Sequence, residues 1–202
     1  MTESWTAFAW GVAALGWLAA LILLLVWQRA RARSAPEAAP AHGGIDFLSQ
    51  LSDRTRFLDA AAREVNRSQR AGHPLSVMLI DIGRLRWFNQ HYGYDAGDRL
   101  LRHVAAACLH SGRDCDLVGR FSHKEFAVML PDTTRDDAQI AAARLETAIA
   151  SSSITLKDGR VVSASIAIGV AALERETDTA DDLLIAADLA LTRIGDSRAT
   201  ET

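Results

Sequence analysis

The hydrophobic positions of this chain form one long apolar run, which is followed by shorter segments of changing period. Residues 6–26 contain no charged residue, and about 20 apolar residues suffice to cross a hydrocarbon core as a helix. Trp5 and Trp27 flank the run, as aromatic rings do at the two membrane interfaces. Three arginines follow it directly, at positions 29, 31 and 33, whereas only Glu3 precedes it. Because positive charge favours the cytoplasmic side, the pattern predicts a single transmembrane anchor over residues 1–33 with its N-terminus outside.

A cleaved signal peptide is the alternative interpretation of the same run. Such a peptide carries its positive charge before the apolar segment and a small-residue cleavage site after it. Here the positive charge lies on the other side, which favours a permanent anchor. Residues 34–44, SAPEAAPAHGG, show no periodicity and are predicted to be a flexible tether. The remaining domain would then cover residues 45–202.

Beyond the tether, segments with helical period alternate with short apolar runs. Helical spacing predicts helices over residues 57–70, 85–92, 98–110, 134–150 and 179–194. Strands are predicted over residues 75–81, 117–121, 125–130, 154–156 and 161–170, and a turn over 93–97. This order predicts an α+β domain in which a central, mainly antiparallel sheet is flanked by helices. The arrangement is of the ferredoxin-like or polymerase-palm kind.

Composition narrows the function classes. The net charge is −3, whereas a protein that binds duplex nucleic acid needs a basic face to neutralise phosphates. We therefore expect no nucleic-acid partner. The two cysteines, Cys108 and Cys115, have neither the spacing of a metal site nor that of a CxxC redox pair.

Several stretches carry a resemblance to a known family. Residues 81–98, DIGRLRWFNQHYGYDAGD, are similar to the pattern DIDxFKxxNDxxGHxxGD of the GGDEF domains of bacterial diguanylate cyclases. Residues 46–57 look like a worn copy of the pattern DxLTGLxNRRxF, and residues 119–126, GRFSHKEF, stand where the family has RxGGDEF. The resemblance covers roughly residues 46–198, in order and with the expected spacing. It implies the nucleotidyl-cyclase fold and a relation to the synthesis of cyclic di-GMP from two GTP molecules.

The resemblance also implies that the catalytic apparatus is degenerate. Nucleotidyl transfer needs carboxylates that hold divalent cations, and Asp81 and Glu125 are the remnants of this metal site. The third signature position is Lys124, and an ammonium at about 4 Å from a cation costs about 4 kcal/mol per unit charge at an effective dielectric near 20. Ser122 and His123 replace the signature glycines. We therefore expect no cyclase activity and no required cofactor, with Mg²⁺ binding only if residual GTP binding or cyclase activity exists.

The resemblance also implies that one ligand-binding site is retained. Arg113 and Asp116 form an RxxD motif that ends five residues before the signature loop, SHKEF at residues 122–126. At the position of this motif the family has its inhibitory site for cyclic di-GMP. Arginine can contact a guanine edge or phosphate with two hydrogen bonds, and aspartate accepts from guanine N–H groups. Arg144 stands where the family has a second arginine contact. The alternatives are an exposed charged turn at 113–116 and an ordinary exposed arginine at 144.

Three further residues match the family's GTP-binding positions. Asn89 and Asp98 match the residues that contact the guanine edge, and Arg86 replaces a lysine. The alternative is structural: Asn89 would cap a turn, and Asp98 would cap the following helix.

Together these features predict a single-pass protein of the bacterial inner membrane with a cytoplasmic GGDEF-like domain. Its expected role is that of a cyclic di-GMP receptor or signalling adaptor, with GTP as a further candidate ligand. One alternative is a residual diguanylate cyclase. Another is a ligand-free pseudoenzyme that docks on an unidentified protein partner, or that forms a homodimer or heterodimer.

Overall fold

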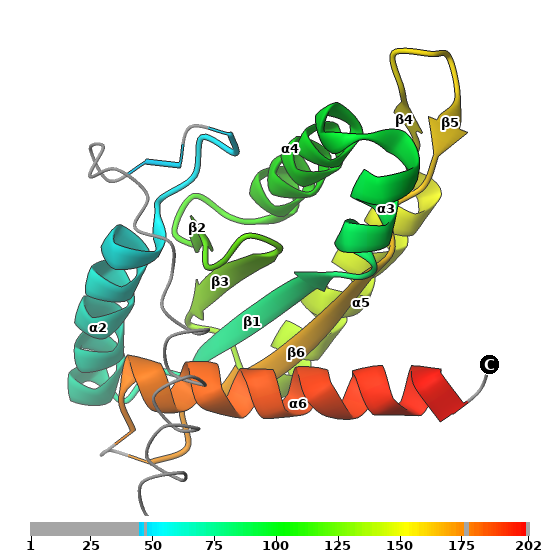
Figure 1. Cartoon of the computed structure of the whole chain (residues 1–202). Helices are drawn as coiled ribbons and strands as arrows, with labels where there is room; N and C mark the ends of the chain where they lie inside the picture. Colours follow the sequence, from blue (N-terminus) through cyan, green and yellow to red (C-terminus); the bar gives the residue numbers. More distant parts are fainter. Residues whose placement is uncertain (1–44, 47, 176–177, 201–202) are drawn as a thin grey trace, which may run out of the picture. The chain divides into compact units, whose positions relative to one another are not determined.

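The computed structural model describes residues 45–46, 48–175 and 178–200 (Figure 1). The predicted anchor, residues 1–33, and the predicted tether, residues 34–44, lie outside the described residues. Among the helices that are described, none is long and apolar enough to span a bilayer. Residues 44–202 form a compact unit, and its two hydrophobic clusters draw their buried members from residues between Leu51 and Leu191. This segment therefore contains a complete core of its own.

A four-stranded sheet forms the centre of the domain. Its strand order is β2-β3-β1-β6, and each neighbouring pair is antiparallel. The strands are β1 (Leu75–Ile82), β2 (Leu117–Arg120), β3 (Glu125–Pro131) and β6 (Ile166–Ala172). β1 occupies a central position and is buried on both faces, which explains its unbroken run of apolar residues. The predicted α+β class with an antiparallel sheet is confirmed.

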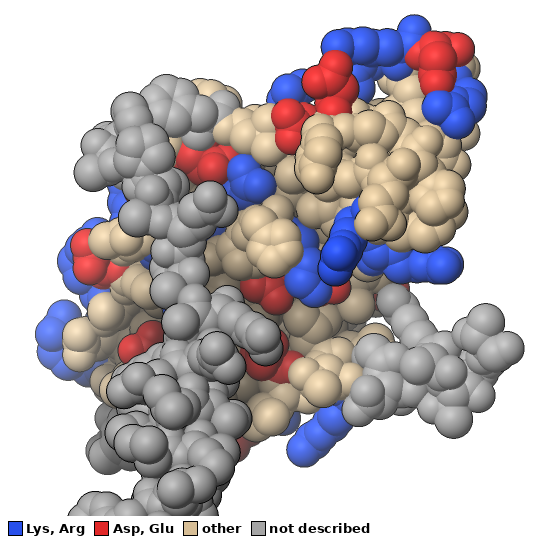
Figure 2. All heavy atoms as spheres, viewed as in Figure 1, with Lys and Arg blue, Asp and Glu red and all other residues tan. Residues whose placement is uncertain are grey.

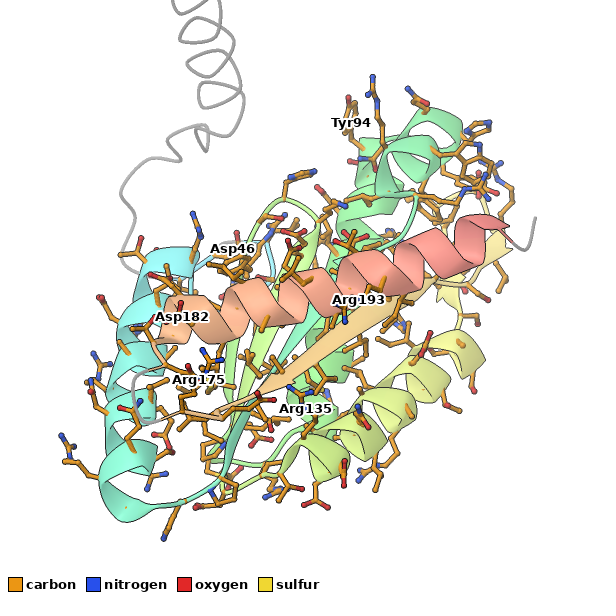
Figure 3. All side chains as sticks on the ribbon, turned by 90° about the horizontal axis from the view of Figure 1, so that it is seen from below. Asp46, Tyr94, Arg135, Arg175, Asp182 and Arg193 are labelled. Carbon is orange, nitrogen blue, oxygen red and sulfur yellow. The ribbon has the colours of Figure 1, made fainter. Side chains whose placement is uncertain are left out.

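Helices cover both faces of this sheet (Figures 1 and 3). One face packs against α3 (Leu85–Tyr92), α4 (Tyr94–Ser111) and α5 (Arg135–Ser151). The other face packs against α2 (Arg54–Ala71) and α6 (Ala180–Thr200). Thr134 caps α5, because its hydroxyl accepts from the backbone N–H of Asp137 at 3.3 Å. Alternating side chains of β1 and β3 reach the two helical layers in turn.

The predicted turn over residues 93–97 is wrong. Only Gly93, with φ of 84°, separates α3 from α4, and the second helix begins at Tyr94. A single glycine with positive φ suffices to redirect the chain. Ala96 and Gly97, which we interpreted as turn residues, are buried in the first turns of α4. Asp98 consequently lies inside this helix and does not cap it.

The predicted strand over residues 161–170 is also wrong in its extent. Residues Val161–Val162 form β5, which pairs with β4 (Ile154–Thr155) in a separate hairpin. The chain joins the main sheet only at Ile166, where β6 begins. Inward and outward positions continue to alternate across the break, since Ala164 is buried between exposed neighbours. The period of two therefore could not reveal where one sheet ends and the other begins.

Candidate functional site

Two carboxylates lie side by side at one end of the sheet. Asp81, near the end of β1, pairs directly with Glu125, the first residue of β3. Leu79 lies two positions before Asp81 and Ala127 two positions after Glu125, and both belong to the hydrophobic cluster beneath α2 and α6. Because side chains alternate along a strand, Asp81 and Glu125 point toward the same face of the sheet. The structure thus brings together the two predicted metal-site remnants.

Lys124 places its ammonium beside this pair. Its Nζ lies 2.5 Å from Oδ1 of Asp81, and the two side chains are 40% and 19% exposed, respectively. Oδ1 of Asp81 is buried and accepts no hydrogen bond of good geometry from the described part of the chain. The contact is therefore an ion pair without a well-directed hydrogen bond. It puts a positive charge next to Asp81 where a divalent cation would need to approach.

The backbone holds Lys124 in this position. Its carbonyl accepts from the N–H of Ile82 at 3.0 Å, so Lys124 is tied to the residue that follows Asp81. On the other side of the loop, the N–H groups of Phe121 and Ser122 donate to the carbonyl of Glu125 at 2.9 and 3.2 Å. The strands predicted over residues 117–121 and 125–130 thus form an antiparallel hairpin. No group of three or more His, Cys, Asp or Glu residues suited to a metal ion occurs within the ranges that the structure describes.

An ion pair between Arg120 and Asp46, which the sequence did not reveal, supports the signature loop. The guanidinium of Arg120 donates to both carboxylate oxygens of Asp46, at 2.9 and 3.0 Å. It also donates to the carbonyls of Ser122 and His123, each at 3.2 Å. Burial raises the pKa of Asp46, but hydrogen bonds from Ser49 and Arg120 outweigh this effect and hold the pKa below its ordinary value. Arg120 thus fastens the segment before α2 to the signature loop.

The predicted guanine-contacting residues meet where α3 crosses α4. The amide of Asn89 lies over Gly97, so closely that a Cβ at position 97 would be 1.8 Å from its Oδ1. This oxygen is buried and has no hydrogen-bond partner among the described residues. Asp98 follows Gly97 directly and is half-buried, whereas Arg86 is exposed on α3. The turn after α3 is closed by the backbone carbonyl of Asn89, which accepts from Gly93 at 2.9 Å, and its side chain is not the cap.

The RxxD motif forms a tight turn between α4 and β2. The backbone N–H of Arg113 donates to Oδ2 of Asp116 at 2.7 Å, and the N–H of Asp116 donates to the carbonyl of Arg113 at 3.0 Å. Oδ1 of Asp116 receives only a weak contact from the thiol of Cys115, at 3.8 Å. The Arg113 side chain is exposed and makes no hydrogen bond or ion pair within the described ranges. The segment is a charged turn, as the alternative states, and it leaves a guanidinium open to solvent.

The RxxD turn and the signature loop lie at opposite ends of β2. The four residues of this strand correspond to about 13 Å. Arg144 is exposed on α5, which packs against α4. Among the described residues, no hydrogen bond or ion pair joins it to Arg113 or Asp116.

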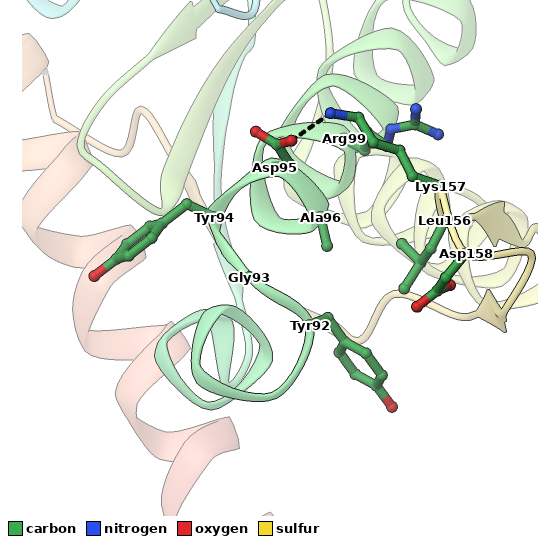
Figure 4. A pocket seen from close by; sticks show the side chains of 9 residues that line it. All are labelled: Tyr92, Gly93, Tyr94, Asp95, Ala96, Arg99, Leu156, Lys157 and Asp158. Carbon is green, nitrogen blue, oxygen red and sulfur yellow. Dashed lines mark hydrogen bonds and ion pairs between the residues drawn. The ribbon is translucent and has the colours of Figure 1, made fainter.

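A separate cleft of about 340 Å³ lies beside the α3–α4 junction (Figure 4). Asp95 and Lys157 form an ion pair at its rim, and Arg99 donates to the carbonyl of Thr155 at 3.0 Å. These contacts attach the β4–β5 hairpin to α4. Tyr92 and Leu156 also line the cleft, and Tyr94 points away from it (Figure 4). The cleft contains none of the predicted site residues, and its walls carry charges of both signs.

Comparison with known proteins decides the family. The sequence profile described as "Diguanylate cyclase, GGDEF domain" matches residues 44–200. The chain is a member of the GGDEF family. The resemblance predicted from residues 46–198 is therefore confirmed.

Curated relatives of this GGDEF domain include two longer signalling proteins. The response regulator PleD of Caulobacter vibrioides is 35% identical over 144 residues, which cover 71% of this chain and 32% of PleD. The diguanylate cyclase TpbB of Pseudomonas aeruginosa is 33% identical over 166 residues, which cover 82% of this chain and 38% of TpbB. The chain thus spans about a third of the length of these relatives.

Solved GGDEF domains share the fold. The GGDEF domain of TpbB from Pseudomonas aeruginosa superimposes with a TM-score of 0.70 at 33% identity, covering 73% of this chain and 86% of that one. The GGDEF domain of DgcB from Caulobacter crescentus, solved in complex with c-di-GMP, gives a TM-score of 0.74 at 19% identity. That match covers 79% of this chain and 94% of the other, and at this identity it supports the fold alone.

Proposed function

We propose that this protein is a membrane-anchored, catalytically inactive GGDEF protein that acts as a cyclic di-GMP receptor. One observation carries the proposal: the ammonium of Lys124 lies 2.5 Å from Asp81. In this arrangement the carboxylate that a catalytic metal would need is already neutralised by a residue of the chain itself. The anchor is the apolar segment at residues 1–33, and the receptor domain is cytoplasmic.

The charge of the signature loop argues against turnover. A divalent cation at Asp81 would have to displace Lys124 or accept its repulsion, which is about 4 kcal/mol per unit charge at 4 Å and a dielectric near 20. The backbone bond from Ile82 to Lys124 limits how far this residue can withdraw. Ser122 and His123 add side chains to the loop at positions where the family's glycines let backbone approach phosphate. No step of nucleotidyl transfer is supported by the remaining pair of carboxylates alone.

The open guanidinium of Arg113 supports ligand binding at the RxxD turn. Asp116 uses Oδ2 to shape the turn, which leaves Oδ1 as an acceptor for guanine N–H groups. An arginine free of internal partners can make two parallel hydrogen bonds to a guanine edge or a phosphate. We infer that cyclic di-GMP binds here as a dimer, with Arg144 as an additional contact, and that binding alters the surface offered to a protein partner.

A second activity, binding of GTP without turnover, is favoured by Asn89. Its buried Oδ1 has no partner among the described residues, and an unsatisfied buried acceptor costs about 1–3 kcal/mol. A guanine N–H donor at this position would satisfy it.

Titration calorimetry with cyclic di-GMP on residues 44–202 tests the receptor proposal. We expect Arg113→Ala to weaken binding by about 100-fold, because it removes two charge-assisted hydrogen bonds of about 1.5 kcal/mol each or more. The backbone N–H that forms the turn is retained in this variant. Arg63→Ala, an exposed arginine of α2, is the matched control and should bind like the wild type. Absence of heat from the wild type at high micromolar ligand would refute the proposal.

A further inference from the structure

The outer face of α3 carries basic and aromatic side chains that the proposed cyclic di-GMP site does not use, and only Arg86 among them is a candidate GTP contact. Leu85 and Phe88 point into the core, so the opposite side of this short helix faces solvent. The exposed residues there include Arg84, which directly precedes the helix, and Arg86, Trp87 and His91, and we call these four residues the α3 patch. In Figure 2 the surface over α3 is uncharged, with Lys and Arg atoms along its lower border.

The charge around α3 differs from that of the chain as a whole. The thirteen residues between Asp81 and Asp95 include two arginines and no acid, in a chain of net charge −3. The two flanking acids are each paired with a lysine, Asp81 with Lys124 and Asp95 with Lys157. Glu125, half-buried on the neighbouring strand, is the acid nearest in register to Asp81. The patch therefore offers unpaired positive charge to an anionic surface.

The aromatic part of the patch suits a membrane interface. Trp87 is 42% exposed, although large apolar side chains are usually buried. Its ring stacks on His91 with centroids 4.0 Å apart, and the guanidinium of Arg84 lies 5.4 Å from the ring centroid. Tyr94, at the start of α4, is 81% exposed. Trp and Tyr rings flanked by arginine are the side chains enriched at the level of lipid headgroups.

We propose that the α3 patch docks on the anionic lipid surface of the bilayer that holds the anchor. This inference rests on the anchor of the proposed function. The predicted tether of eleven residues, 34–44, spans at most about 40 Å, so the domain stays close to the headgroups at high effective concentration. Each arginine near an anionic surface raises the bound population about fivefold. Two arginines and one interfacial tryptophan give a free domain a weak affinity, which vesicles in excess still reveal, and the tether makes the same site sufficient.

Docking through α3 would leave the RxxD turn exposed. α3 contains Asn89 and follows the C-terminal end of β1, where the N–H of Ile82 donates to the carbonyl of Lys124. β1 and β2 run in the same direction, because each is antiparallel to β3. The RxxD turn precedes β2 and therefore lies at the opposite end of the sheet. A domain docked on its α3 patch therefore leaves Arg113 accessible from the cytoplasm.

The fluorescence of Trp87 can report on this contact. Four of the five tryptophans lie at positions 5, 10, 17 and 27, so Trp87 is the only tryptophan of residues 44–202. This segment contains a complete core and can be studied without the anchor. Titration with vesicles that contain phosphatidylglycerol should shift the Trp87 emission to shorter wavelength at low ionic strength. Vesicles of pure phosphatidylcholine should leave it unchanged, and 0.5 M salt should abolish the shift, because it screens the arginines.

Two double variants decide whether the α3 patch is the contact. Arg84→Ala with Arg86→Ala should reduce the apparent affinity for the anionic vesicles by about 25-fold. Arg56→Ala with Arg63→Ala removes the same charge from exposed positions of α2 and should have less than a threefold effect. An equal loss in both variants, or no emission shift with anionic vesicles, would overturn the inference. Cyclic di-GMP calorimetry without vesicles is independent of this result, so failure of the two proposals can be told apart.

Discussion

Replacing Lys124 with aspartate should turn a metal-excluding site into a cation-binding one. The substitution removes the ammonium that lies 2.5 Å from Asp81 and adds a third carboxylate beside Asp81 and Glu125, which are paired across β1 and β3. Clusters of carboxylate oxygens are the ligands that Mg²⁺ and Mn²⁺ prefer. Ser122 and His123 remain, so metal binding is expected and cyclase activity is not.

The expected size of the effect follows from the exposure of the two side chains. Two carboxylates about 4 Å apart repel each other by about 4 kcal/mol at an effective dielectric of 20. Lys124 is 40% exposed, so solvent screening reduces the net cost in the metal-free variant to roughly 2 kcal/mol. For a domain of this size that cost lowers Tm by about 4–8 °C. Magnesium at about ten times its dissociation constant should restore about 1.4 kcal/mol, or about 3–6 °C.

Thermal unfolding of residues 44–202 with and without Mg²⁺ or Mn²⁺ measures this directly. The wild type should show no metal-dependent change in Tm, and Lys124→Asp should show a saturable increase. Lys124→Met is the matched control, since it removes the ion pair without adding a carboxylate, and its Tm should not respond to metal. The reasoning fails if the wild type is stabilised by Mg²⁺ as strongly as Lys124→Asp, or if Lys124→Asp does not respond.

Three further predictions concern the frame around the site. Asp46→Asn should lower the free energy of unfolding by roughly 1–3 kcal/mol, measured by urea unfolding at pH 7. Because the pKa of Asp46 is held low in the folded domain, the full difference from the wild type should be present above the pKa of the unfolded chain, about 3.9. It should disappear as the pH falls through the pKa of the folded state. Gly119→Ala places a Cβ 2.7 Å from the side chain of Phe57, and we expect it to cost about 1–3 kcal/mol in the same assay, so an unchanged midpoint would contradict the packing. A thiol reagent should label the exposed Cys115 in the folded domain and react with Cys108 only on unfolding. Cys108 is buried, and burial raises its pKa to about 12. Equal labelling rates of the two cysteines in the folded domain would contradict this.

Much of the fold was predictable, because local sequence patterns determine several of its helices and strands. β1 is buried on both faces, so its apolar run identifies it without any knowledge of its neighbours. The inward positions of α6, from Leu183 to Leu191, follow from helical period alone. Lys124 was the informative departure from the family pattern, and the structure adds that its ammonium contacts Asp81 directly.

Other features depend on contacts between distant parts of the chain. Asp46 and Arg120 are 74 residues apart, and both lie in stretches that resemble family motifs, but a sequence does not state which charges pair. The start of α4 at Tyr94 depends on the packing of Ala96 and Gly97 against α3. Their small side chains are as common in turns as at helix crossings. The free guanidinium of Arg113 likewise became visible only with the fold of its turn.

The most direct test of the account is a turnover assay on the full chain. The protein is incubated with GTP and Mg²⁺ or Mn²⁺, and the products are separated by chromatography. Because Lys124 neutralises Asp81, we expect GTP to remain unconverted and no cyclic di-GMP to form. Formation of cyclic di-GMP that is lost in Asp81→Ala would contradict the account.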